Sequence, residues 1–282
     1  MLLEVNGVEL WVETFGDEAD PAVLLIGVSM LSWPDGLCRS LSGRYVVRYD
    51  LRDTGRSTYV DPDAPAYDLR DLVTDASGLI KALNVERAHV VGLGVGGFVA
   101  QLLALDHADQ VASLTLISTR SVAPGPVDPD LADHDPELMQ QLFGRPMPDW
   151  TERESVVDYM IGSAQLMAGS RGFDEQEVRA AAGAVFDRSK PSATAQRANH
   201  LGTVFAALDC SPRWRERLGE ISVPTLVVHG DEDGFFPHQN GEALADEIPG
   251  ATLLTLPGIG QGVPRAAWPT VVPALLEHTE AS

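Results

Sequence analysis

The stretch "HVVGLGVGGFVAQ" (residues 89–101) joins an apolar, β-branched run to a glycine-rich turn and then to a helical pattern. Its glycines fit two different motifs. Gly92, Gly94 and Gly97 match G-x-G-x-x-G, the turn that cradles the pyrophosphate of a dinucleotide. The five residues from Gly92 also match G-x-S-x-G, a sharp strand-to-helix turn that presents a nucleophilic serine, with glycine in the serine position. The elements around the turn decide between the two interpretations.

The position of the turn argues against a dinucleotide site. Such a turn follows the first strand of its fold, and an acid about 20 residues later holds the ribose. Here the turn follows the third predicted parallel strand, and the next strand ends in Ile117-Ser118-Thr119 without an acid. Asp109 has nearly the right spacing but lies before that strand. We therefore expect no nucleotide cofactor, and no cofactor of another kind.

Strand and helix patterns alternate on both sides of the turn. An antiparallel hairpin is predicted at the start, where an alternating strand follows Asn6-Gly7. Continuous apolar runs then predict buried parallel strands, and helical patterns separate them. These strands lie at 22–28, 44–50, 88–93 and 112–119, with helices at 71–83 and 96–107. We expect an α/β fold with a mostly parallel, doubly wound sheet.

The pattern changes after residue 120. Residues 121–136 are rich in Pro and Asp and are typical of a linker. Strand patterns then disappear, and helices are predicted at 152–168, 174–186 and near 193–208. Strands return at 223–230 and 251–258, each followed by a helix. We therefore predict a core of residues 1–120 and 214–282, interrupted by a helical cap at 121–213.

Composition limits the classes of partner. The net charge of −21 repels nucleic acid and anionic membranes, so we expect neither as a partner. Cys38 and Cys210 lie far apart and have no metal-ligand spacing, so we expect reduced thiols and no metal site. The N-terminus carries acids where a signal peptide is basic, and no apolar run is long enough to span a bilayer. We expect a cytoplasmic monomer or homodimer that binds a small hydrophobic molecule.

Five stretches carry a family resemblance: "SWPDGLCRSL", "YVVRYDLRDTGRST", "AHVVGLGVGGFVAQLLALDHADQVASLTLIST", "VPTLVVHGDEDGFFP" and "LPGIGQGVPRAAWP". Together they resemble the α/β-hydrolase fold family over essentially the whole chain. Within that family the chain is most similar to the aclacinomycin methylesterase type, whose members act on aromatic polyketides. The resemblance favours the hydrolase turn over the dinucleotide turn.

The resemblance implies three catalytic positions. In the family a serine at the apex of the turn attacks the ester, a histidine takes its proton, and an acid orients the histidine. The matching positions here are Gly94 for the serine, Asp233 for the acid and Gln261 for the histidine. Glycine offers no nucleophile, and glutamine is no base near neutral pH. Since losing the serine or the histidine typically lowers turnover about a million-fold, we predict that ordinary ester hydrolysis is lost.

Other parts of the family site are retained as candidates. The Val95 amide, at the start of a helix, is placed to stabilise an oxyanion, and an amide near Val28 is the candidate second donor. The loop at Gly27-Val28 is short for the family, so the second donor stays open. Asp233 and Gln261 are interpreted either as a hydrogen-bonded pair that orients a substrate or as an old contact that was kept. Candidate substrate contacts are Ser29, Trp33, Arg120 and His238.

Three functions fit this pattern. The first is a non-hydrolytic catalyst that acts by positioning and by oxyanion-type amides. It would catalyse cyclisation, C–C bond formation, elimination or rearrangement of a polyketide-like molecule. The second is an inactive binding protein for a small hydrophobic ligand. The third is a residual ester hydrolase whose water is activated by Asp233 or by another group. We favour the first, because the nucleophile and the base are both replaced while the turn, the acid and the cap remain.

Overall fold

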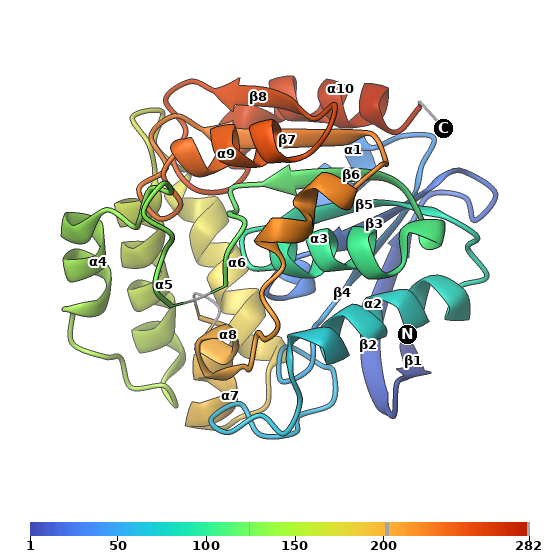
Figure 1. The fold of residues 1–282 in the computed structure, drawn as a ribbon. Helices are drawn as coiled ribbons and strands as arrows, with labels where there is room; N and C mark the ends of the chain where they lie inside the picture. Colours follow the sequence, from blue (N-terminus) through green and yellow to red (C-terminus); the bar gives the residue numbers. More distant parts are fainter. Residues whose placement is uncertain (124, 201–202, 281–282) are drawn as a thin grey trace.

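The structure, a computed structural model, describes residues 1–123, 125–200 and 203–280. Its centre is one sheet of eight strands in the order β1-β2-β4-β3-β5-β6-β7-β8 (Figure 1). The pairs β1–β2 and β2–β4 are antiparallel, and all the other pairs are parallel. The predicted α/β fold is therefore confirmed. The strands are β1 (Leu2–Val5), β2 (Val8–Phe15), β3 (Ala22–Ile26), β4 (Tyr45–Tyr49), β5 (Ala88–Leu93), β6 (Val111–Ile117), β7 (Thr225–Gly230) and β8 (Thr252–Leu256).

The opening hairpin forms where the sequence predicts it. Asn6 and Gly7 both have positive φ, +48° and +74°. A two-residue type I′ turn requires this conformation at both positions, and Asn-Gly is the pair that adopts it most readily.

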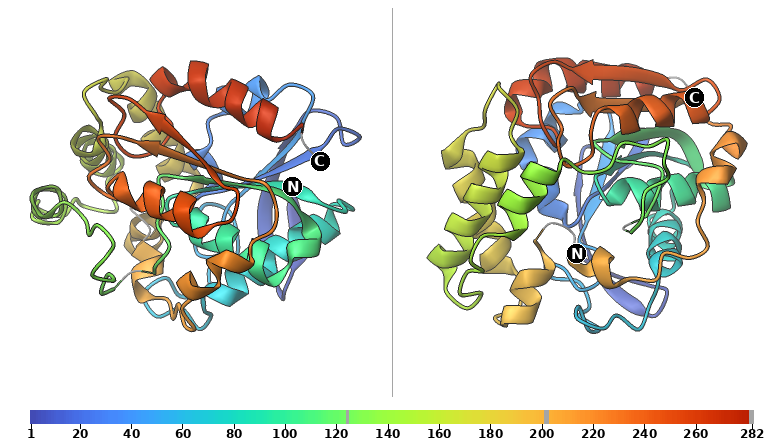
Figure 2. Two further views of the ribbon diagram at one scale, coloured as in Figure 1. Left: turned by 45° about the horizontal axis from the view of Figure 1, so that its top comes forward. Right: turned by 60° about the vertical axis from the view of Figure 1, so that its left-hand side comes forward.

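Helices cover both faces of the sheet (Figure 2). One buried core includes side chains of α2 (Leu69–Ala82), α3 (Gly96–Asp106) and α9 (Gln239–Glu247). The other includes side chains of α1 (Asp35–Ser40) and α10 (Trp268–His278). Alternate residues of β3 enter the two cores, and this is why its sequence is apolar throughout.

The order of the strands creates a crevice. β4 and β5 lie on opposite sides of β3, so the connections that leave β3 and β5 diverge at their carboxyl ends. Open parallel sheets bind their ligands at such a switch point. Val28 follows β3 and Gly94 follows β5, so both lie at this edge.

The helices between β6 and β7 gather at one end of the sheet, away from both chain termini (Figure 1). They fall inside the predicted cap, whose boundaries stay a prediction. The expected helix near 193–208 is divided into α7 and α8, with residues 201–202 outside the described part of the chain, and α4 was not predicted. None of the described helices is long and apolar enough to cross a membrane. The helices are α4 (Pro136–Phe143), α5 (Arg153–Met167), α6 (Glu175–Arg188), α7 (Ala193–Ala198) and α8 (Thr203–Ala207).

A buried ion pair joins α6, one of the helices α4 to α8 that are here called the cap, to the rest of the chain, here called the core. Asp50, at the end of β4, has no exposed surface. Its Oδ1 accepts hydrogen bonds from Arg188 Nη1 at 2.9 Å and from the Met30 amide at 3.0 Å. Its Oδ2 accepts from the Arg56 amide at 3.0 Å and lies 2.9 Å from Arg188 Nη2. One carboxylate therefore joins the end of α6 to two loops of the core.

Replacing Arg188 is expected to cost the fold a large share of its stability. Arg188→Met leaves the Asp50 carboxylate buried without its cation, and breaking a buried pair in this way costs about 3–5 kcal/mol. Arg179 on the same helix is the matched control, because its side chain is 45% exposed and pairs with the exposed Asp158. Arg179→Met should cost less than about 1 kcal/mol. Urea denaturation of both variants measures the difference, and equal losses would show that the Asp50 pair is not special.

Candidate functional site

The turn between β5 and α3, here called the elbow (residues 92–97), depends on close packing at three glycines. A β-carbon on Gly92 would lie 2.7 Å from the Gly96 oxygen. One on Gly96 would lie 2.3 Å from the Ile26 oxygen, and one on Gly97 would lie 2.5 Å from Thr119 Oγ1. Since β-carbons do not approach other atoms so closely, the backbone of the elbow admits only glycine at these positions.

Gly94, at the apex of the elbow, is different. A β-carbon there would lie 3.9 Å from Gln261 Nε2 and 4.0 Å from the Ser118 backbone oxygen, so there is space for a side chain. Its φ of +57° belongs to the left-handed region, and its amide donates to the Ile117 oxygen at 2.9 Å. The structure thus brings together positions 94 and 261, for which the resemblance predicts the serine and histidine roles.

A cavity of about 260 Å³ lies above Gly94. Val95 lines it at the N-terminal end of α3, where the first amides of a helix lack intrahelical partners. Val28 lines it from the loop after β3, so both candidate oxyanion positions face the same space. We call this the elbow cavity; its lining residues are Val28, Ser32, Leu93, Gly94, Val95, Phe235, Phe236, Gln261 and Gly262.

Asp233 lies behind this cavity and does not line it. Its Oδ1 accepts from the amides of Phe235 and Phe236, both at 2.9 Å. No hydrogen bond joins Asp233 to the Gln261 side chain within the described residues, so the expected pair is not formed in this structure. His229 Nε2 is 3.6 Å from Oδ2, but it is also 2.7 Å from the Phe236 oxygen and donates there.

Burial raises the pKa of Asp233 to about 7, because desolvation outweighs its two amide hydrogen bonds and the nearby Ser118 hydroxyl. The neighbouring His229 gives no compensating charge, since burial lowers its pKa to about 4. The carboxyl therefore holds its proton to a higher pH than an exposed aspartate does.

Ser118 is a site residue that sequence reasoning missed. It follows β6, is fully buried and has φ of +44°, a conformation that is uncommon for residues other than glycine. Its Oγ accepts from the Gly262 amide at 3.0 Å and so fixes the loop that carries Gln261. Its position directly after a predicted parallel strand could have marked it as a residue at the edge of the sheet where ligands bind.

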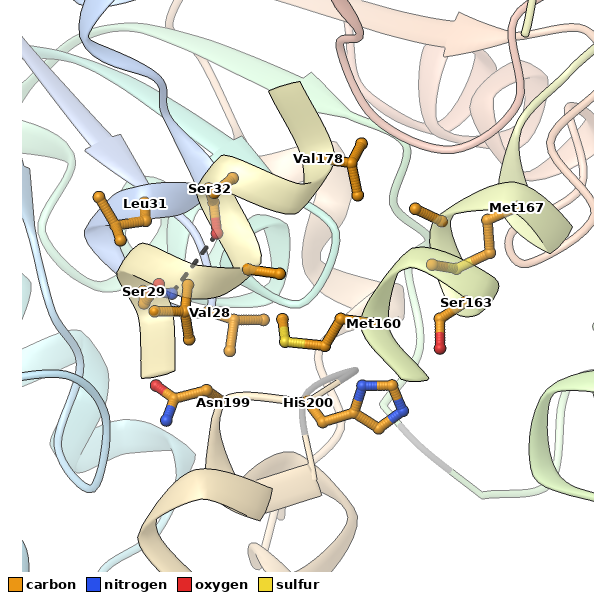
Figure 3. Close-up of a pocket in the computed structure, with 14 residues that line it drawn as sticks. Val28, Ser29, Leu31, Ser32, Met160, Ser163, Met167, Val178, Asn199 and His200 are labelled. Carbon is orange, nitrogen blue, oxygen red and sulfur yellow. Dashed lines mark hydrogen bonds between the residues drawn. The ribbon is translucent and has the colours of Figure 1, made fainter. Parts of the chain in front are cut away.

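A second cavity, of about 250 Å³, lies between the core and the cap (Figure 3). Met160 and Met167 of α5 lie across it from Val28 and Ser32 of the core, and Ser163 of the same helix also lines it. Val28 and Ser32 line both cavities, so the two adjoin. We call this the cap cavity; its lining residues are Val28, Ser29, Leu31, Ser32, Met160, Ser163, Ala164, Met167, Val178, Ala181, Ala182, Val185, Asn199 and His200.

His200 is the titratable residue among those that line the cap cavity. Its ring packs against Tyr159, with ring centroids 4.9 Å apart, and against Trp150 at 5.9 Å. Burial, with a contribution from the positive charge of Arg145, lowers its pKa to about 4. The ring is therefore neutral at pH 7.

The remaining candidate contacts separate into two groups. Ser29 lines the cap cavity. Trp33, Arg120 and His238 line neither cavity. Trp33 is buried in the core beside α1, and Arg120 donates to the oxygens of Val122 and Ala123. His238 Nε2 lies 2.9 Å from Thr255 Oγ1, so this ring is turned toward β8.

Comparison with known proteins agrees with this arrangement. Residues 23–261 match the family model for the alpha/beta hydrolase fold. The chain belongs to the α/β-hydrolase fold family. Rhodomycin D methylesterase DauP of Streptomyces sp. strain C5 is 32% identical over all of this chain and 98% of its own length. Rhodomycin D methylesterase DnrP of Streptomyces peucetius is 31% identical over 98% and 96%.

Solved structures of an esterase and an enol-lactonase share the fold. Esterase RhEst1 from Rhodococcus sp. ECU1013 superimposes with a TM-score of 0.77 at 18% identity, covering 99% of this chain and 98% of the esterase. The enol-lactonase from Burkholderia xenovorans LB400 has a TM-score of 0.72 at 22% identity, covering 99% and 100%. At these identities the likeness concerns the fold alone.

The raised pKa of Asp233 predicts an unusual pH dependence of stability. In the unfolded chain this carboxyl ionises near pH 4, whereas in the folded protein it keeps its proton to about pH 7. The free energy of unfolding should therefore fall as pH rises from about 4 to 7, by at most about 1.4 kcal/mol per pH unit, and then level off. Asp233→Asn, which keeps the acceptor oxygen, should lose this contribution and gain stability relative to the wild type across that window.

Denaturation of both proteins at a series of pH values tests this. Asp231→Asn is the control, because Asp231 lies exposed on the same loop. If the Asp233→Asn and wild-type curves run parallel from pH 4 to 8, the Asp233 carboxyl does not titrate as described.

Proposed function

We propose that this α/β-hydrolase is a cofactor-independent catalyst that does not hydrolyse esters and that acts on a hydrophobic, polyketide-like molecule. The reaction would be a cyclisation, C–C bond formation, elimination or rearrangement. The observation that carries the proposal is the open apex at Gly94, beside Gln261, in an otherwise intact elbow. A substrate carbonyl can approach the Val95 amide there without meeting a nucleophile.

The surroundings of the apex support catalysis by positioning. Holding reacting groups in the right geometry supplies up to about 7–11 kcal/mol of a barrier, and no covalent step is needed. Amides aimed at a developing oxyanion stabilise it most when water is excluded, as in a cavity walled by Leu93, Phe235 and Phe236. The relatives named as rhodomycin D methylesterases support a polyketide-like substrate class.

A binding protein is the second candidate, and one observation favours it. Among the described residues, none that lines the elbow cavity titrates between pH 4 and 9. A residual hydrolase has less support, because Asp233 lies behind Phe235 and Phe236 rather than in the cavity, where a water would have to be activated.

Restoring the missing side chains should create an esterase. Gly94→Ser with Gln261→His is expected to hydrolyse simple aryl esters and to react with a fluorophosphonate probe, because positions 94 and 261 are adjacent and open. The wild type and each single variant should stay inactive and unlabelled. Strain at φ of +57° should cost the Gly94→Ser variants about 1–2 kcal/mol of stability. A folded but inert double variant would show that these are not the triad positions.

Product formation separates the catalyst from the binding protein. We incubate the wild type with aromatic polyketide precursors and no cofactor, and expect a new product. Mass spectrometry should show that any ester group of the precursor is kept in this product. Gly94→Leu, which fills the elbow cavity, should abolish that product. Tight binding of polyketides that are always recovered unchanged would contradict catalysis and support the carrier.

A further inference from the structure

The loop that carries Gln261 packs against the end of the cap helix α5 by backbone contact. A β-carbon on Gly169, two residues past that helix, would lie 2.5 Å from the Gly258 oxygen and 2.6 Å from the Gly260 nitrogen. A β-carbon on Gly260 would in turn overlap the Met167 oxygen. Neither Gly169 nor Gly260 has the left-handed φ that favours glycine, so glycine is required here by lack of space.

Two backbone hydrogen bonds hold the same surfaces together. The Gln261 amide donates to the Met167 oxygen at 3.1 Å. The Arg171 amide donates to the Gly258 oxygen at 2.9 Å. Close-packed backbone of this kind yields little, so the two segments keep one relative position.

The loop after β7 encloses the Gln261 loop from the other side. A β-carbon on Gly230, the last residue of β7, would overlap the backbone oxygens of Ile259 and Gly260. The amide two residues later, at position 232, donates to the Ile259 oxygen at 3.0 Å. Gly260 is therefore enclosed between Gly230 and Gly169, and we call these three residues the glycine interlock.

Side chains contribute less to the placement of this loop. In a Ser-His-Asp triad the acid orients the histidine through a hydrogen bond. Within the described residues no hydrogen bond joins Asp233 to the Gln261 side chain, and Asp233 Oδ1 accepts from other amides. Ser118 and Asp231 each accept one hydrogen bond from an amide of the loop. The closest contacts of the loop are those of the interlock.

We infer that Gly169 is a positioning residue for Gln261, and that the glycine interlock, rather than the acid, sets where residue 261 lies beside the apex. Nε2 of Gln261 lies 3.9 Å from the place of a β-carbon on Gly94, and this spacing is kept because the loop is enclosed on both sides. The importance of the spacing for catalysis rests on the proposed function. The interlock itself is a property of the folded chain.

Hydrogen exchange at the Gln261 amide, followed by NMR, tests the inference. Gly169→Ala should raise the exchange rate about tenfold more at Gln261 than at Val91 in the central strand β5, because overpacking displaces the backbone locally. Gly219→Ala is the matched control, since a β-carbon there would meet nothing within 4 Å. Asp233→Asn, which leaves the interlock intact, should not raise the rate at Gln261.

Two results would overturn the inference. Equal rises at Gln261 and Val91 in Gly169→Ala would show a general loss of stability and no local role. Faster exchange at Gln261 in Asp233→Asn, as large as in Gly169→Ala, would return the positioning role to the acid.

Glu232→Ala serves if Gly169→Ala does not fold. The exposed Glu232 carboxylate accepts from the Ser170 hydroxyl at 2.8 Å and from the Ser170 amide, so its removal loosens the same segment without overpacking. The exchange rate at Gln261 should then rise about threefold relative to that at Val91. An unchanged ratio would contradict the interlock.

Esterase activity of the Gly94→Ser, Gln261→His double variant gives a second readout. Adding Gly169→Ala should lower kcat roughly 10–100-fold and leave KM for aryl esters unchanged, because a catalytic group misplaced by about 1 Å loses that much. Gly219→Ala in the same background should change neither constant. An unchanged kcat in the folded triple variant would show that Gly169 does not position residue 261.

These outcomes are distinct from a failure of the proposed function, because amide exchange requires no activity. Local exchange as expected, in a wild type that converts no substrate, would contradict catalysis and leave the interlock in place. New products from a wild type in which Gly169→Ala causes only a general loss of stability would do the reverse. An inert double variant would contradict the triad positions, and amide exchange alone would then decide on the interlock.

Discussion

The buried carboxylate of Asp50 is the constraint on which the geometry of both cavities depends. It accepts from the Met30 amide, in the loop that lines both cavities, and from Arg188, at the end of the cap helix α6. The Arg56 amide also donates to this carboxylate, which attaches the turn after β4 to the same point. A carboxylate without exposed surface is tolerated only with such donors, so these three segments keep one arrangement. The walls of the cavities are therefore set before a ligand arrives, and the ligand pays less ordering entropy when it binds.

The elbow separates what the fold requires from what hydrolysis requires. Gly92, Gly96 and Gly97 are fixed by contacts with neighbouring backbone and side chains, and a β-carbon at any of them would overlap another atom. The apex has no such contact. Its positive φ is less strained for glycine than for serine, so the fold gains slightly when the nucleophile is absent. The scaffold can therefore form with glycine at the apex, and the family likeness alone does not imply the family's reaction.

Much of the fold could be predicted from local patterns. Continuous apolar runs located the parallel strands, and Asn6-Gly7 located the hairpin. The elbow motif was also visible in the sequence, whereas the pairing of positions 94 and 261 came from the family resemblance. Helix α4 was missed although Asp135 caps it and Pro136 begins it, because the Pro-rich segment before it resembled a linker. The contacts that shape the site could not be predicted, since they join residues far apart in the chain: Asp50 with Arg188, and Ser118 with Gly262.

Asp233 shows why a residue at a predicted triad position need not act as part of a triad. Both sequence interpretations connected it with Gln261, as a working pair or as a remnant. In the structure its Oδ1 instead holds the amides of Phe235 and Phe236, which wall the elbow cavity. Burial disfavours the ionised form of this carboxyl and raises its pKa, so keeping it here has a cost. The two hydrogen bonds offset part of that cost. Without an acceptor at this position, the amides of Phe235 and Phe236 would be left unsatisfied behind the cavity wall. Asp233 therefore shapes the wall of the elbow cavity beside positions 94 and 261.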